Sequence, residues 1–252
     1  MLDETKNQPG SADPSVPAGT KRDTRRPPLS GLPPLESGDR LKLAEFMRRY
    51  EAMPDVKKAE LIEGVVYMPS PVRVEHSSPH GDLIWFLVSY KIATPGVQSS
   101  DNTTALLDDD NGPQPDASLR ILPECGGQSR TENGYVAGAP ELMAEISAST
   151  VSRDLHDKFT AYERSGVLEY LVWRVWDAAL DWFVLRDGRF ARVEPDEQGV
   201  IRSSSFPGLW LNVLAMLEGD LPRVLETLQL GLATPEHAAF VERLRNPPPP
   251  AQ

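Results

Sequence analysis

The chain has a single cysteine, no apolar run long enough to cross a bilayer, and aromatic side chains at only 7% of its positions. One cysteine, Cys125, excludes a framework of internal disulfide bonds and is typical of a protein in a reducing compartment. A membrane span needs about 20 mostly apolar residues in succession, and the N-terminal residues are polar where a secretory signal is apolar. We therefore expect a cytoplasmic protein with no membrane partner.

Positive charge is also scarce. The 26 Lys and Arg residues are outnumbered by 37 Asp and Glu residues, which gives a formal net charge of -11 at pH 7. Proteins that bind nucleic acid through its phosphates normally carry a surplus of Lys and Arg. The balance therefore argues against loose, non-specific binding to nucleic acid. It does not decide the chemistry of a local site, because net charge mainly governs solubility and long-range steering.

The length of 252 residues and an apolar content of 40% predict one domain with one substantial core. Residues 1–38 are rich in Pro, Gly, Ser and Thr without periodic apolar positions, so we expect a disordered arm there. The basic cluster of the arm, Lys21 to Arg26, either touches a phosphate backbone or is simply solvated, and the second is favoured. We expect the domain over 39–232, and a C-terminal helix with a Pro-rich tail over 233–252.

Apolar periodicity predicts both helices and strands along the domain. The expected helices cover residues 41–50, 154–166, 221–232 and 235–244. The expected strands lie within residues 59–68, 96–107, 115–121, 140–147, 169–173, 180–185 and 190–193. Asp108 to Gly112, with the sequence DDDNG, predicts a solvated turn and lacks the ligand spacing of a calcium loop. The last two helices offer a contact surface for a homodimer.

His76 and His80 have the spacing of two zinc ligands on one face of a helix. Ser78 followed by Pro79, however, is typical of a helix that begins with proline as its first residue. On that interpretation His76 precedes the helix and the two imidazoles share no face. We therefore expect hydrogen-bonding or surface histidines here and no zinc site.

Two carboxylates stand out on short apolar strands. In the strand that follows Pro115, Ala117 and Leu119 point one way and Asp116 points the other. In the strand over 142–147, Glu145 likewise alternates with apolar neighbours. If the two strands are neighbours, Asp116 and Glu145 converge on one face of the sheet. The alternative is that Asp116 caps a turn and Glu145 is a solvated strand residue.

Two adjacent carboxylates raise each other's pKa unless a cation lies between them. Magnesium suits this arrangement because it takes hard oxygen ligands and commonly uses one or two carboxylates together with a substrate phosphate. A bound ion also lowers the pKa of a coordinated water and stabilises charge on phosphate oxygens. The pair therefore indicates metal-assisted phosphate chemistry.

Lys158 adds a cation to this group of residues. It lies along the apolar stripe of the helix expected over 154–166, beside Leu155 and Tyr162. An ammonium group is strongly hydrated, so a lysine at such a position needs a partner. One interpretation is that Lys158 extends along its apolar stem to the surface. The other is that it reaches the carboxylates, where it orients the attacking water or stabilises the phosphate.

Several motifs follow one another in an order that carries a family resemblance. They are ELIEG at 60–64, PSP followed by His76, QPD at 114–116, PELMAEIS at 140–147, and a D-x-x-x-K-x-x-x-Y spacing that begins at Asp154 and leads into EYLVW at 169–173. FPGLWLNV and GDLPRVLETLQLGL follow at 206–213 and 219–232. This order, over Leu41 to Gly231, resembles the Uma2 family of putative restriction endonucleases, within the PD-(D/E)xK nuclease superfamily.

The resemblance implies an α/β fold, with a restriction-endonuclease-like mixed β-sheet core flanked by helices. It also implies that Asp116 and Glu145 are metal ligands, with the Ile146 backbone carbonyl as a third protein oxygen. The basic superfamily pattern has a lysine two residues after the glutamate, where this chain has Ser147, and family members resemble this chain in carrying the lysine on the following helix, as Lys158. Glu60 and His76 match further recurrent positions and are accessory candidates, whereas Tyr162 is expected in the core.

The first functional hypothesis is an endonuclease that hydrolyses DNA phosphodiester bonds with Mg²⁺ or Mn²⁺. Asp116 and Glu145 would bind the metal, and Lys158 would assist the attack of water. A second hypothesis is a non-cleaving adaptor for nucleic acid or protein that keeps the fold. A third is a nuclease directed at RNA, with the same metal chemistry. The fold alone does not distinguish these three.

Overall fold

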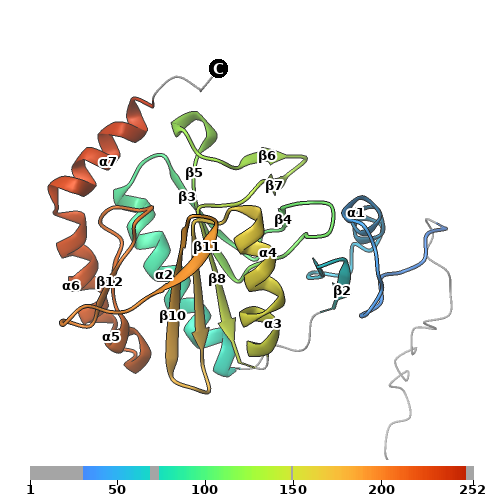
Figure 1. Cartoon of the computed structure of the whole chain (residues 1–252), viewed down its shortest axis with the longest axis horizontal. Helices are drawn as coiled ribbons and strands as arrows, with labels where there is room; N and C mark the ends of the chain where they lie inside the picture. Colours follow the sequence, from blue (N-terminus) through green and yellow to red (C-terminus); the bar gives the residue numbers. More distant parts are fainter. Residues whose placement is uncertain (1–30, 69–73, 149, 248–252) are drawn as a thin grey trace, which may run out of the picture.

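The structure is a computed structural model that describes residues 31–68, 74–148 and 150–247 (Figure 1). The first thirty residues of the expected arm, including its basic cluster, lie outside the described residues, as do the last five residues of the expected tail. Leu35 is buried against the N-terminal part of the domain. Packed structure therefore begins a few residues before position 39. Among the described residues, no helix is long and apolar enough to cross a membrane.

A mixed sheet of six strands forms the centre of the fold, in the order β11-β10-β9-β8-β5-β3. Neighbouring strands run antiparallel except β8 and β9, which are parallel. The strand bounds are β3 (Val97–Asp101), β5 (Ala117–Ile121), β8 (Leu142–Ser147), β9 (Glu169–Arg174), β10 (Ala179–Arg186) and β11 (Arg189–Val193). Strand β5 pairs directly with β8, so the condition under which Asp116 and Glu145 converge is met.

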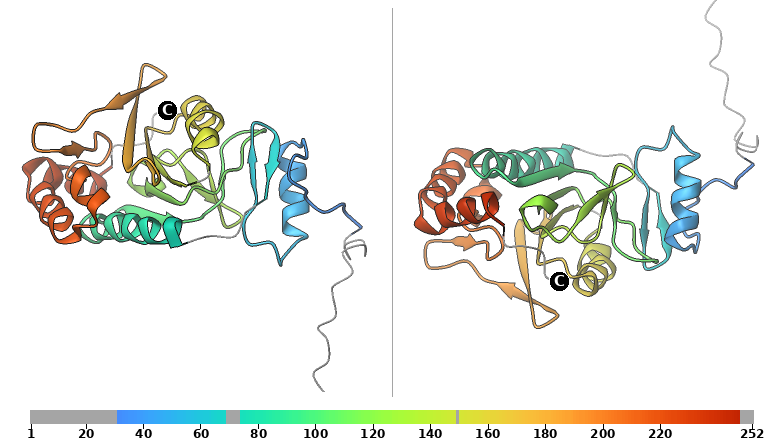
Figure 2. Two further views of the ribbon diagram at one scale, coloured as in Figure 1. Left: turned by 90° about the horizontal axis from the view of Figure 1, so that it is seen from below. Right: turned by 90° about the horizontal axis from the view of Figure 1, so that it is seen from above.

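The sheet is covered by helices on both faces, as Figures 1 and 2 show. On one face, α2 (Val74–Ala93) packs Leu83 and Phe86 against Ala117 and Ala144 of the sheet. On the other face, α3 (Val151–Leu155) and α4 (Asp157–Ser165) cover the side chains that alternate with these. This layered arrangement of helices around a mixed sheet confirms the fold class expected from the sequence.

The N-terminal part lies at one end of the molecule (Figure 2). It consists of α1 (Leu43–Glu51) and a hairpin of β1 (Glu60–Ile62) and β2 (Val65–Tyr67). Phe46 of α1 and Leu61 of β1 share a small apolar cluster separate from the main core. Arg164 of α4 donates to Glu63 in the turn of the hairpin at 2.8 Å, which ties this part to the central layers.

The C-terminal part lies at the opposite end (Figure 2). It contains the strand pair β12 (Val200–Arg202) and β13 (Trp210–Asn212), followed by α5 (Val213–Glu218), α6 (Leu221–Leu232) and α7 (Pro235–Arg245). The two long helices agree closely with the expected bounds. Phe240 and Leu244 of α7 belong to the same core as the central sheet, so the C-terminal helix is part of that core.

A smaller sheet is formed by segments that follow β3 and β5 in the chain. It has the strand order β4-β7-β6, with β4 (Ala105–Leu106), β6 (Arg130–Glu132) and β7 (Tyr135–Ala137). A single turn of 3-10 helix over Pro123–Cys125 connects β5 to this region.

Two expectations about helices were wrong. Helix α2 begins at Val74, so Pro79 lies inside it and His76 is helical. A proline so near the start removes one hydrogen bond, and the apolar contacts of the later turns hold a 20-residue helix despite that loss. The expected helix over 154–166 is in fact two helices separated at His156, whose φ of −125° and ψ of −73° are not helical.

Candidate active site

Asp116 lies immediately before β5, beside the end of β8. The ladder pairs Ala117 with Ala144, so the same register places Asp116 opposite Glu145 one step further along. The Oδ2 atom of Asp116 accepts the backbone N–H of Ile146 at 2.9 Å, which fixes the carboxylate against that strand. Residues opposite one another on antiparallel strands direct their side chains to the same face. Pairing of the two strands therefore brings the two acids together.

Three cationic or hydrogen-bonding groups surround the Asp116 carboxylate. Lys58 Nζ lies 3.0 Å from Oδ1, and His76 Nε2 lies 3.2 Å from Oδ2. Burial by itself would raise the pKa of Asp116. The contacts with His76 and with the ammonium groups of Lys58 and Lys158 outweigh burial and hold this pKa well below its usual range. Asp116 is therefore an anion over the whole physiological pH range.

Glu145 is buried on β8, with a side chain only 3% exposed. Its Oε1 accepts the hydroxyl of Tyr162 at 2.8 Å and lies 2.9 Å from Lys158 Nζ. Burial is the largest influence and raises the pKa of Glu145 to about 8, with Lys158 opposing the rise and the negative charge of Asp116 adding to it. A cation near this carboxylate favours its ionised form.

Lys158 of α4 is buried, with its side chain 2% exposed. Its Nζ lies 2.8 Å from Glu60 Oε1 and 2.9 Å from Glu145 Oε1, and Asp154 Oδ1 is 3.8 Å away. Burial would lower the pKa of Lys158, but these carboxylates raise it above its usual value, so the ammonium stays charged. The side chain does not extend to the surface.

Glu60 reaches the site from the N-terminal hairpin. It is buried on β1, and its Oε1 accepts the backbone N–H of Gln114 at 2.9 Å as well as the ammonium of Lys158. We refer to Glu60, Asp116, Glu145 and Lys158 as the carboxylate–lysine centre. Its four residues come from β1, the position before β5, β8 and α4, so it links the N-terminal hairpin to the sheet.

The two histidines lie on the same helix, one turn apart, with ring centroids separated by 5.9 Å. His76 contacts the Asp116 carboxylate, whereas His80 Nε2 lies 2.8 Å from the Asp116 carbonyl oxygen and 3.2 Å from Asp101 Oδ1. The expectation that they share no face was wrong because α2 starts earlier than the Ser-Pro signal indicates. The sequence also predicted hydrogen-bonding histidines at these positions, and that prediction agrees with these contacts.

Ile146 directs its N–H toward Asp116, and the N–H and C=O groups of one strand residue point to the same side. Its carbonyl is therefore on the Asp116 side of β8. Ser147, at the position where the superfamily pattern has a lysine, donates its hydroxyl to the Asp154 carboxylate. Asp154 also accepts from Thr150, at the start of α3. The residue that replaces the lysine thus anchors the helices that deliver Lys158.

Sequence reasoning missed Lys58, Asp154 and the polar role of Tyr162. Lys58 precedes β1 and meets Asp116 from 58 positions away, so no spacing pattern links the two. Asp154 begins the D-x-x-x-K spacing, and its four-residue offset from Lys158 was an available signal. Tyr162 is buried as expected, but its hydroxyl also holds Glu145.

The donor set at this centre fits a hard divalent cation. Asp116 and Glu145 could supply carboxylate oxygens and Ile146 a carbonyl oxygen, and Mg²⁺ needs only one or two carboxylates because waters and substrate phosphate complete its shell. Within residues 31–68, 74–148 and 150–247, no group of three or more His, Cys, Asp or Glu side chains is arranged to hold a metal without such help. The centre therefore suits a weakly held ion shared with the substrate.

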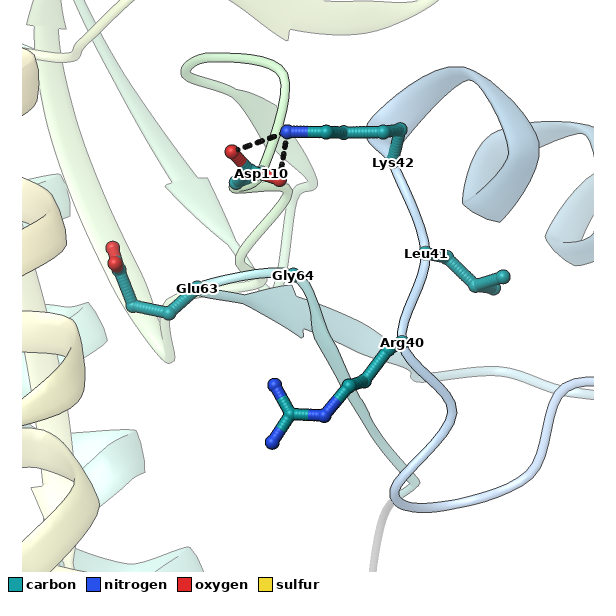
Figure 3. A pocket seen from close by; sticks show the side chains of 6 residues that line it. All are labelled: Arg40, Leu41, Lys42, Glu63, Gly64 and Asp110. Carbon is teal, nitrogen blue, oxygen red and sulfur yellow. Dashed lines mark hydrogen bonds and ion pairs between the residues drawn. The ribbon is translucent and has the colours of Figure 1, made fainter.

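A separate open pocket of about 320 Å³ lies near the start of α1 (Figure 3). Its lining includes Arg40, Glu63 and the ion pair of Lys42 with Asp110, whose Nζ to Oδ1 distance is 2.7 Å. None of its lining residues belongs to the carboxylate–lysine centre.

Comparisons with known proteins identify the fold and the family. A solved structure of a putative nuclease belonging to DUF820 from Anabaena variabilis matches with a TM-score of 0.54 and 18% identity, covering 70% of this chain and 99% of that chain. At that identity the likeness shows the fold alone. No curated protein matches the chain.

The profile of the Uma2 family, described as a putative restriction endonuclease, matches residues 43–214. This span is more than half of the chain and contains the whole carboxylate–lysine centre. The chain therefore belongs to the Uma2 family.

Proposed function

We propose that the protein is a metal-dependent endonuclease that hydrolyses phosphodiester bonds in DNA. The observation that carries this proposal is the buried Lys158, whose ammonium lies 2.8 Å from Glu60 and 2.9 Å from Glu145, on the face of the paired strands β5 and β8 where Asp116 also lies. Family membership and the fold support it. Burying a lysine among carboxylates is costly to stability unless the geometry is good, so such a cluster is a reasonable mark of function.

Asp116, Glu145 and the Ile146 carbonyl would hold Mg²⁺ or Mn²⁺. When bound, the ion lowers the pKa of a coordinated water and neutralises charge on the phosphate oxygens. The Ile146 N–H holds the Asp116 carboxylate beside β8, and the Tyr162 hydroxyl holds the Glu145 carboxylate in place. Pre-set oxygens of this kind need little rearrangement when the substrate arrives.

Lys158 would donate to the attacking water or to a non-bridging phosphate oxygen. Its charge is secure because the surrounding carboxylates keep its pKa high. In the hydrolysis, a water oxygen forms a bond to phosphorus and the bond from phosphorus to the leaving sugar oxygen breaks. The attacking water gives up a proton to bulk solvent, and the leaving sugar oxygen takes one up from bulk solvent and departs as the alcohol. Glu60 holds the ammonium in place from the other side, and so acts as a positioning residue.

Cleavage of plasmid DNA tests the proposal. Wild-type protein with Mg²⁺ or Mn²⁺ should nick the plasmid, and Asp116→Asn or Glu145→Gln should reduce the rate at least about 100-fold, because each removes a ligand charge that acts in the transition state. Asp109→Asn is the matched control, since Asp109 is an exposed acid outside the centre. Its rate should equal that of the wild type.

Two results would point elsewhere. Equal cutting by all four proteins would remove the site assignment. Binding of DNA without cutting under any divalent cation would favour the non-cleaving adaptor. Matched DNA and RNA oligonucleotides in the same assay separate a DNA nuclease from an RNA-directed one.

A further inference from the structure

Arg153 lies on α3, five positions before Lys158, beside the carboxylate–lysine centre. Its guanidinium stacks over the ring of Tyr67 in β2, with the Cζ atom 4.7 Å from the ring centroid. Its side chain is 24% exposed, so the group is mostly enclosed but still reachable from solvent. Stacking on an aromatic face orients the planar guanidinium without using any of its N–H donors.

The donors of Arg153 are almost unused in the described part of the chain. Its Nε is buried without a hydrogen-bond partner, and its nearest acid, Glu60 Oε2, is 4.0 Å from Nη2, beyond hydrogen-bond distance. Glu60 itself is already bound to Lys158 and to the Gln114 amide. An unpaired buried donor is costly, and arginine has five N–H donors in a fork that matches phosphate.

The other partly buried arginines among the described residues are paired. Arg174 donates to Asp181 at 2.6 Å, and Arg49 donates to Glu45 at 2.6 Å. Arg153 differs from these in being positioned by a ring and left with free donors. In a chain of net charge -11, nucleic acid needs local cations to approach an acidic centre.

We propose that Arg153, oriented by the ring of Tyr67, binds a non-bridging phosphate oxygen of the DNA strand held at the carboxylate–lysine centre. This inference rests on the proposed function. The N–H donors of the guanidinium bind the phosphate oxygen. Because Arg153 lies beside Glu60 and Lys158, the phosphate that it binds lies close to the bond that is cleaved. Arg153 is thus a substrate-binding residue that supplies part of the positive charge the rest of the protein lacks.

The test measures binding of a short DNA duplex by fluorescence anisotropy in EDTA, with the full-length Asp116→Asn protein as the reference so that no cleavage occurs. Adding Arg153→Gln should weaken binding about tenfold and reduce the slope of log affinity against log salt by about one, because one phosphate contact is lost. Arg153→Lys should recover part of the affinity, since it keeps the charge and loses the fork.

Arg189→Gln is the matched control, because Arg189 is an exposed arginine that pairs with Glu163 away from the centre. It removes the same charge and should leave the slope unchanged. Thermal unfolding of each protein checks folding, and a purely structural role for Arg153 would lower stability while leaving the salt slope of the folded fraction unchanged.

The outcomes separate the two proposals. If the reference protein binds DNA and Arg153→Gln changes neither affinity nor slope, the role of Arg153 is overturned and the nuclease proposal stands. If the reference protein binds no DNA at any salt concentration, both proposals fail.

Discussion

At the scale of single residues, Asp116 Oδ1 has two candidate partners, the Lys58 ammonium and a divalent ion. Asp116 Oδ2 is committed to the Ile146 N–H and to His76, whereas Oδ1 is in contact with Lys58 Nζ at 3.0 Å. A divalent ion bound to Asp116 would approach Oδ1 and would repel the ammonium there. Lys58 also donates to Asn102 at 2.8 Å, so it has a second partner to which it can remain attached when it leaves the carboxylate. On the proposed function, Lys58 would therefore compete with the metal ion for Asp116 Oδ1.

Replacing Lys58 tests this competition. Lys58→Gln removes the ammonium and should tighten Mn²⁺ binding about tenfold, which corresponds to about 1.4 kcal/mol. Isothermal titration calorimetry with Mn²⁺ alone measures the effect without any substrate. Lys57→Gln is the matched control, because Lys57 is exposed and donates only to the Pro54 carbonyl. Equal affinity in the two variants would show that Lys58 does not hold the metal off.

The roles available to Asp116 and Glu145 followed from the two-residue alternation of their strands, which is a local property of the chain. The partners of these acids did not. Lys58 and His76 contact Asp116 from 58 and 40 positions away in the chain, and Glu60 meets the Gln114 amide from 54 positions away. Periodicity within one segment carries no information about such long-range contacts. The structure was needed to show which cations neutralise which acids.

At the scale of elements, helix α6 lies unusually close to the loop before β13. A Cβ atom built on Gly231 would lie 2.3 Å from the backbone oxygen of Gly208 and 2.7 Å from Cγ of Trp210. The helix can pack this tightly only because Gly231 has no side chain. The position illustrates why glycine, which weakens a helix by its own propensity, is retained there.

Gly231→Ala should therefore destabilise the protein by about 1–3 kcal/mol, although alanine normally favours a helix by about 1 kcal/mol over glycine. Backbone atoms lie on the other side of the contact and cannot move aside cheaply. Urea unfolding of the variant measures the change. Gln229→Ala, at an exposed position two residues earlier on α6, should be close to neutral. An unchanged or higher unfolding free energy for Gly231→Ala would mean that the helix shifts without cost.

The errors in element bounds have one cause. Ser78-Pro79 and the apolar stripe over 154–166 are local signals, and they indicated one helix start and one uninterrupted helix. Tertiary contacts overrode both. Helix α2 is held by its packing on the sheet, and the break at His156 lets α3 place Asp154 under Ser147 while α4 places Lys158 beside Glu145. Where local preference is weak, packing decides the backbone.

At the scale of the whole molecule, α7 closes the core from the C-terminal side. Its His237 is buried, with Nε2 at 3.0 Å from Thr94 Oγ1 of the segment after α2 and Nδ1 at 3.0 Å from the Leu232 carbonyl. Burial lowers the pKa of His237 below its ordinary value, while the hydrogen bond to Leu232 opposes the shift. The imidazole of His237 thus connects α7 to the end of α6 and to the segment after α2.

This lowered pKa makes the stability depend on pH. Below its ordinary pKa of about 6.5, a histidine takes up a proton in the unfolded chain before His237 does so in the folded chain. The contribution to stability is therefore present above that pH and is lost as pH falls through the folded pKa. Urea unfolding near neutral pH and in mild acid should show a smaller loss for His237→Gln than for the wild type.

His156→Gln is the control for this measurement, because His156 is exposed between α3 and α4. Its pH dependence should follow that of the wild type. If His237→Gln loses as much stability in acid as the wild type does, then protonation of His237 does not contribute to the loss.

By itself, the sequence determined the composition of the core, the faces of β5 and β8, and most of the later strands and helices, because alternation and helical periodicity are local consequences of burying apolar side chains. Together with the family resemblance, it also pointed to Asp116, Glu145 and Lys158. Only the tertiary structure decided three contacts. Glu60 pairs with Lys158 alongside Glu145, Lys58 pairs with Asp116, and Arg153 stacks on the ring of Tyr67. These arrangements depend on which distant segments pack together, and that outcome is set by the free energy of the whole fold.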